Sequence, residues 1–216
     1  MARETFHQEL DDLIGDVIVM GSMAEKAIAR AVDSLKNCSM EQAEQVIEDD
    51  EKVNRRRFEI EESCIRLIAT QQPMARDLRT IVSAIHLATD LERIGDYASG
   101  IAEITLLLSD DRPVKSLMDI PRMAEIGIGM LQDSLKSLLN RDAEKAREIA
   151  RRDDEIDELY HNVLQQCFAR MAEDPNIETR LIWVAHKLER IADRVTNICE
   201  RVTFVVTGNI EELDSA

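Results

Sequence analysis

The chain carries acidic side chains at helical spacing where aliphatic residues are expected. Glu92 and Asp96 lie four residues apart, and Glu189 and Asp193 repeat that spacing 97 residues later. On a helix with 3.6 residues per turn, each pair lies on the face that is aliphatic in the preceding turns. An amphipathic helix normally buries that face. Carboxylates are therefore predicted on the inward side of two long helices.

Two other predicted helices contain the same kind of interruption. Asp50 stands where an apolar line of residues is due to continue, and Asp153 does so in the second half of the chain. One turn further along these helices lie Asn54 and Asp157. If neighbouring helices form antiparallel hairpins, their inward acids meet at similar heights, within about one turn of 5.4 Å.

Converging carboxylates repel one another and lose hydration, so they require cations, shared protons or basic partners. Hard oxygen ligands on facing helices suit Mg²⁺, Mn²⁺ or iron, and also Zn²⁺, and such clusters form the metal sites of helical bundles. Glu103 and Glu200 continue the acidic faces. The candidate metal ligands are Asp50, Asn54, Glu92, Asp96, Glu103, Asp153, Asp157, Glu189, Asp193 and Glu200.

Arginine side chains are the obvious rivals to metal ions as partners of these acids. Arg93 and Arg190 adjoin the glutamates in sequence, but on a helix they project about 100° away from them. We therefore expect metal ions to neutralise the acids. The alternative is that the acids are solvated, or pair with side chains of the first and fourth helices. His186 is a candidate accessory ligand, although the equivalent residue of the first half is Thr89.

The elements that position these acids are predicted to be helices. Aromatic residues make up only 3% of the chain, which has 7 glycines and 4 prolines, whereas good helix formers are abundant. Strands would need more β-branched and aromatic residues and more turn signals. The sequence predicts an all-α protein with six helices over about residues 6–37, 39–69, 74–108, 119–139, 142–172 and 177–207.

The two halves of the chain repeat each other. LATDLERIGD ends at Asp96 and VAHKLERIAD ends at Asp193, and the tetrapeptide DSLK begins at both Asp33 and Asp133. Agreement at so many positions indicates a tandem duplication. We predict two pseudo-symmetric three-helix bundles, residues 1–112 and 113–216.

Charge and motif content exclude several classes of protein. Basic residues number 27 and acidic residues 43, so the net charge is 27 − 43 = −16, which disfavours nucleic acid as a partner.

The first ten residues lack an apolar signal segment, and apolar runs are too short to insert into a membrane. Four cysteines without a CxxC pair fit reduced thiols in a cytoplasmic protein. Nucleophile constellations and Gly-rich phosphate loops are absent, so we expect no enzyme.

The motifs resemble those of the phosphate-uptake regulator family PhoU. The resemblance rests on QQPMARDLR at the start of the third predicted helix, on LERIGD followed by GIAE, and on LERIAD followed by NICE. It covers nearly the whole chain. It implies two three-helix bundles whose paired acidic motifs hold multinuclear metal clusters, formed here by Asp50 and Asn54 with Glu92 and Asp96, and by Asp153 and Asp157 with Glu189 and Asp193. Asn54 replaces an acid, and Gly100 stands where the second repeat has Asn197, so we expect the first site to be the weaker one.

The resemblance also implies a biological role. Members of the family are cytoplasmic negative regulators of the phosphate response that link a phosphate ABC transporter to a membrane-bound sensor histidine kinase. We expect the same role, and a homodimer, for this chain. Two rivals stay open: a carboxylate-rich multi-metal hydrolase or oxidase acting on a phosphorylated or small-molecule substrate, and a helical scaffold whose acids bind no metal.

Overall fold

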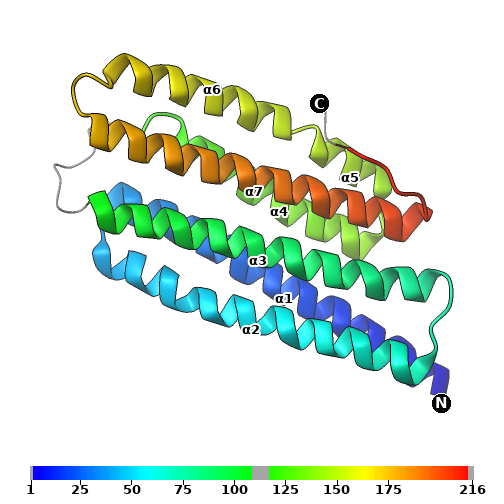
Figure 1. Ribbon diagram of the computed structural model, residues 1–216. Helices are drawn as coiled ribbons and strands as arrows, with labels where there is room; N and C mark the ends of the chain where they lie inside the picture. The colour runs from blue at the N-terminus through cyan, green and yellow to red at the C-terminus, as the bar shows by residue number, and fades with distance from the viewer. Residues whose placement is uncertain (1, 109–116, 214–216) are drawn as a thin grey trace.

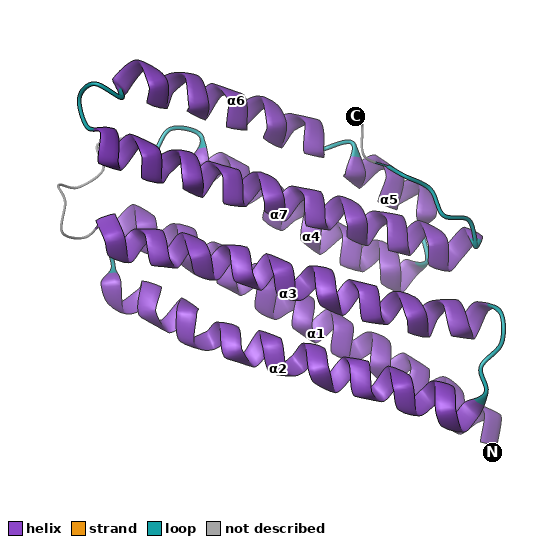
Figure 2. Ribbon diagram, in the orientation of Figure 1, coloured by secondary structure: helices purple, strands orange, loops and turns teal. Residues whose placement is uncertain are grey.

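The computed structural model describes residues 2–108 and 117–213, and throughout these ranges the regular structure is helical (Figure 2). The prediction of an all-α protein is confirmed. The helices are α1 (Ala2–Asn37), α2 (Met40–Gln71), α3 (Arg76–Leu108), α4 (Ile120–Asn140), α5 (Ala143–Ala150), α6 (Asp153–Arg170) and α7 (Pro175–Thr207).

The prediction of one continuous helix over residues 142–172 is wrong, because this segment forms two helices. The chain breaks at Arg151 and Arg152, between α5 and α6. Charge placement favours the break: Arg147 lies in the last turn of α5, and Asp153 begins a run of three acids in the first turn of α6. Arg152 Nη1 also donates a hydrogen bond to Asp133 Oδ2 of α4 at 3.2 Å, which holds the break against that helix.

The helices form two bundles that lie against each other (Figure 1). The first contains α1, α2 and α3, and the second contains α4, α7 and the α5–α6 pair in place of a single helix. Helices α3 and α7 run antiparallel where the bundles meet, and α1 contacts α4. The predicted pseudo-symmetric bundles are therefore confirmed as a fold class, while the proposed boundary between residues 112 and 113 lies outside the described residues.

The apolar lines of the sequence form a continuous core. Leu13, Val17 and Met20 of the α1 line are all buried, as are Ile60 of α2 and Ile94 of α3. Cysteines follow the same pattern with one exception: Cys64, Cys167 and Cys199 are buried, whereas Cys38 is exposed at the turn after α1.

The turn between α1 and α2 is held by a helix cap at Ser39. Ser39 has an extended backbone, and its side chain accepts a hydrogen bond from the backbone N–H of Gln42 at 3.4 Å. Replacing Ser39 with alanine is expected to lower the free energy of unfolding by about 1 kcal/mol, because that N–H loses its partner. Urea unfolding measures the difference, and an unchanged midpoint would show that water replaces the cap.

Within the described ranges, no helix combines the length and the apolar character needed to cross a bilayer.

Candidate functional site

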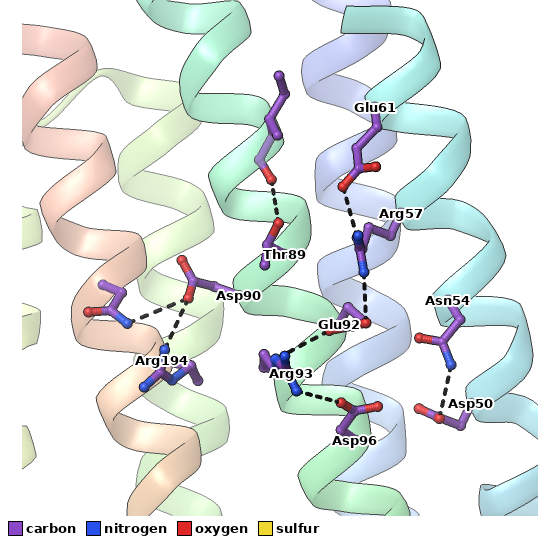
Figure 3. A network of polar contacts seen from close by, with 12 residues as sticks. Asp50, Asn54, Arg57, Glu61, Thr89, Asp90, Glu92, Arg93, Asp96 and Arg194 are labelled. Atoms are coloured by element: carbon purple, nitrogen blue, oxygen red, sulfur yellow. Dashed lines mark hydrogen bonds and ion pairs between the residues drawn. The ribbon is translucent and has the colours of Figure 1, made fainter.

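Helices α2 and α3 bring the first set of predicted acids together. Asp50 and Asn54 of α2 face Glu92 and Asp96 of α3, and we call these four residues the first seam (Figure 3). Asn54 Nδ2 donates a hydrogen bond to Asp50 Oδ2 at 3.3 Å. The helices approach closely here, since a Cβ atom on Gly95 would lie 3.0 Å from Asp50 Oδ1. The predicted alignment of inward acids on antiparallel helices is present in the structure.

The acids of the first seam disturb one another's protonation. The pKa of Asp50 is raised to about 6, first by burial and then by the charges of Asp96, Glu92 and Glu103, while the hydrogen bond from Asn54 acts to lower it. The pKa of Asp96 is raised as well, by burial and by Glu92. Because like charges disfavour ionisation, the seam has a net attraction for cations.

Arginine side chains partly satisfy that attraction. Arg57 Nη1 donates a hydrogen bond to Glu92 Oε1 at 3.0 Å, and its Nε donates to Glu61 Oε1 at 2.8 Å (Figure 3). Arg93 Nη1 lies 3.5 Å from Asp96 Oδ2, and its Nε lies 3.7 Å from Glu92 Oε2. The expectation that Arg93 points away from the acids is wrong, because a long flexible side chain reaches a neighbour three residues along the helix.

The second seam consists of Asp153 and Asp157 of α6 with Glu189 and Asp193 of α7. Asp153 is buried at the first residue of α6, Glu189 and Asp193 are partly buried, and Asp157 is exposed. Here too an arginine reaches the acids, since Arg190 Nη1 donates to Asp193 Oδ2, contrary to expectation.

The exposed side chain of His186 contacts the second seam. His186 Nδ1 lies 3.3 Å from Glu189 Oε2, and the His186 ring lies 6.0 Å from that of Tyr160 on α6. This is the contact expected of an accessory ligand residue. Whether His186 binds metal stays a prediction.

The two remaining candidate ligands differ in their surroundings. Glu103 is exposed on α3, although its charge reaches Asp50. Glu200 Oε1 accepts a hydrogen bond from the backbone N–H of Leu213 at 3.0 Å. In the same segment Glu211 forms a bidentate ion pair with Arg147, with both N–O distances 2.8 Å. Glu200 therefore helps to hold the C-terminal segment against α5 and α7.

The chemistry of the first seam fits a hard cation. Asp50 Oδ1 is buried and accepts no hydrogen bond from any described residue, and a buried carboxylate oxygen of this kind requires a partner. Glu92 Oε2 also accepts no hydrogen bond from the described residues, and Arg93 Nε lies 3.7 Å from it. In their present rotamers, however, no three described His, Cys, Asp or Glu side chains are grouped closely enough to hold a metal. Binding would therefore require side-chain rotation, including release of Glu92 by Arg57.

Asp90 is a further buried polar group that the sequence patterns did not indicate. Its Oδ1 lies 3.7 Å from Arg194 Nη1 and 3.5 Å from Asn197 Nδ2 of α7, on the side of α3 away from the first seam (Figure 3). Burial raises the pKa of Asp90 to about 6, although Arg194 and Asn197 lower it. One feature of the sequence could have indicated Asp90: the two repeats differ in charge at this position, where the second half has Lys187.

Fold and seams together define a duplicated three-helix-bundle protein with acidic motifs on facing helices. The sequence model of the PhoU domain matches residues 17–105 and again residues 120–202. The chain belongs to the PhoU family.

Similar proteins agree over nearly the whole length. The "Phosphate-specific transport system accessory protein PhoU homolog" of Clostridium acetobutylicum is 37% identical, covering 99% of this chain and 100% of the relative. The Serratia marcescens protein PhoU is 34% identical over 94% of this chain and 85% of its own length. The crystal structure of PhoU from Pseudomonas aeruginosa has a TM-score of 0.89 at 34% identity, covering 94% of this chain and 100% of that one. The Streptococcus pneumoniae PhoU structure has the same TM-score at 30% identity, covering 95% and 99%.

Proposed function

We propose that this protein is an accessory protein of phosphate-specific transport that regulates phosphate uptake and represses the phosphate-starvation response. The observation that carries the proposal is the full-length similarity to proteins named as phosphate-specific transport system accessory proteins. Such a regulator acts from the cytoplasm, by contact with other proteins rather than by catalysis.

The proposed partners are the cytoplasmic subunits of a phosphate ABC transporter and a sensor histidine kinase. A net charge of −16 steers the protein toward basic protein surfaces and away from anionic lipid headgroups. Helix α2 also presents Phe58 and Ile65, seven residues apart and both more than half exposed, on its outer surface. Residues at this spacing lie on one helical face, which suits docking through a helix surface.

We further propose that the seams bind divalent or trivalent metal ions, with iron, Mn²⁺, Mg²⁺ and Zn²⁺ as candidates. Asp50, Glu92 and Asp96 would hold the metal of the first seam, and Asp153, Glu189 and Asp193 that of the second. The metal would supply positive charge that offsets the repulsion seen at Asp50. Its role would be to stiffen the α2–α3 and α6–α7 hairpins, which form the docking surfaces.

Removal of the gene in its own host is expected to switch on phosphate-starvation genes while phosphate is plentiful. A reporter for a phosphate-starvation promoter measures this effect, and a plasmid copy of the wild-type gene should restore repression. Unchanged reporter expression in the deletion strain would contradict the regulatory role. Purified protein that hydrolyses phosphoesters, with loss of activity in Glu189→Ala, would instead support a multi-metal hydrolase.

A further inference from the structure

A cleft opens between α3 and α7 beside the seams but apart from the Asp90 network. Its volume is about 510 Å³, and it is lined from α3 by Tyr97, Gly100 and Leu107 and from α7 by Trp183, Lys187 and Arg190, among others. That volume lies in the range of small-ligand sites. Five of the lining residues come from α3 and four from α7, so the cleft exists only where the bundles meet.

The two sides of the α3–α7 contact carry different residues at equivalent positions of the repeats, and the cleft lies on one side only. An offset of 97 residues relates Asp90 to Lys187, and likewise relates Tyr97 to Arg194 and Gly100 to Asn197. On one side of the α3–α7 contact, Asp90 reaches Arg194 and Asn197 across the two helices. On the equivalent side Lys187 faces Gly100, and a Cβ atom on Gly100 would lie 2.3 Å from Lys187 Nζ.

The cleft side therefore carries the cation Lys187 where the other side has the anion Asp90, and Tyr97 where the other side has the cation Arg194. Within the described residues, Lys187 has no carboxylate within 4 Å of its ammonium group, and the exposed Glu103 is the acid in the lining. Arg190 supplies a second positive charge next to it, although Asp193 shares that guanidinium. Two cations at the rim of one cleft suit a phosphoryl anion.

Aromatic and aliphatic side chains form the rest of the wall. Trp183 is 52% exposed and Leu107 is 53% exposed, and both line the cleft. An indole that remains accessible next to cationic groups offers a stacking surface for a planar ring.

We propose that this cleft binds a phosphorylated small molecule that carries a planar ring, of the nucleotide class. Lys187 and Arg190 bind the phosphoryl group, and Trp183 stacks on the ring. Gly100 is required because a side chain there would displace the Lys187 ammonium group. The cleft adjoins the second seam, because Arg190 also pairs with Asp193, so ligand binding is tested on metal-free protein.

The single tryptophan of the chain makes the proposal directly testable, because all indole fluorescence comes from Trp183 in the cleft. Full-length protein in buffer with a metal chelator is titrated with AMP, with adenosine and with inorganic phosphate. AMP is expected to change the fluorescence saturably, and adenosine and phosphate to bind at least about tenfold more weakly, since each lacks half of the contacts. Equilibrium dialysis of AMP confirms the affinity without an optical signal.

Variants separate the site from general effects on folding. Lys187→Ala and Gly100→Ala are each expected to weaken AMP binding about tenfold, whereas Lys136→Ala, an exposed lysine of α4, leaves it unchanged. Gly100→Ala should keep or raise the thermal midpoint, because alanine favours the helix and the atom it meets is the end of a flexible side chain. Absence of saturable AMP binding, equal affinity for phosphate or adenosine alone, or full binding in Lys187→Ala would overturn the proposal.

Discussion

Metal-free protein carrying Asp50→Asn is expected to be more stable than wild type at pH 7, by about 1 to 2 kcal/mol after allowance for solvent screening. Burial, Asp96 and Glu92 raise the folded-state pKa of Asp50 to about 6, above its ordinary value of 3.8. The folded state therefore binds a proton more tightly than the unfolded state. The stability that protonated Asp50 contributes to the fold is complete below pH 4 and is lost as the pH rises through 6. Asparagine removes the charge that causes this loss.

Urea unfolding at pH 4 and pH 7 measures the effect, and the advantage of Asp50→Asn should shrink toward pH 4. Its neighbour provides a matched control with the opposite sign. Asp49 accepts hydrogen bonds from Lys52 and Arg30, which lower its pKa, so Asp49→Asn is expected to be neutral or destabilising at pH 7. A destabilised Asp50→Asn protein at pH 7 would contradict the electrostatic description of the first seam.

Addition of metal should reverse the order of the two proteins. A ligand at 100 times its dissociation constant stabilises a protein by about 2.7 kcal/mol per site. Wild type would gain that amount at the first seam, whereas Asp50→Asn would lose most of it because an amide is a weaker ligand for a hard cation.

Replacement of Arg57 with methionine is expected to have two opposite effects of comparable size. The ion pairs of Arg57 with Glu92 and Glu61 disappear, and Glu92 remains partly buried without its cation, so metal-free stability falls by about 1 to 3 kcal/mol. Metal affinity at the first seam rises about tenfold, because the metal no longer competes with the guanidinium group for Glu92. Calorimetric titration and urea unfolding measure the two effects separately.

Arg56→Met is the matched control for this experiment. Arg56 adjoins Arg57 on α2 but contacts Asp16 at 3.6 Å and Glu59 at 3.1 Å, outside the first seam. The Arg56→Met substitution should therefore leave the metal affinity of the first seam unchanged. Weaker metal binding in Arg57→Met than in Arg56→Met would show that the guanidinium group supports the metal site rather than competing with it.

The sequence predicted the positions of the acids well, because an acid in an otherwise apolar helical line has only one face to occupy. Asp50 and Asp153 both lie on buried faces as expected. The exposure of the outlying acids was harder to predict: Asp157 and Glu103 were expected on inward faces, but both are exposed. A helical wheel gives the direction of a side chain but not the distance to the neighbouring helix.

Other features depend on contacts that a linear pattern does not contain. The position of Arg57 beside Glu92 depends on the pairing of two helices and on the reach of a flexible side chain. The break between α5 and α6 was signalled by charges alone, without glycine or proline. The α3–α7 cleft arises from the bundle contact, where a charge difference between Asp90 and Lys187 changes the packing.

Metal binding by the two seams is the proposal on which the other predictions for the seams depend. The most direct measurement is calorimetric titration of metal-free, full-length protein with Mn²⁺ or Fe²⁺, alongside a variant carrying Glu92→Gln and Glu189→Gln. We expect wild type to bind at least one ion per seam saturably, and the double variant to bind at least tenfold more weakly. No saturable heat with either metal, or equal binding by the two proteins, would contradict the proposal.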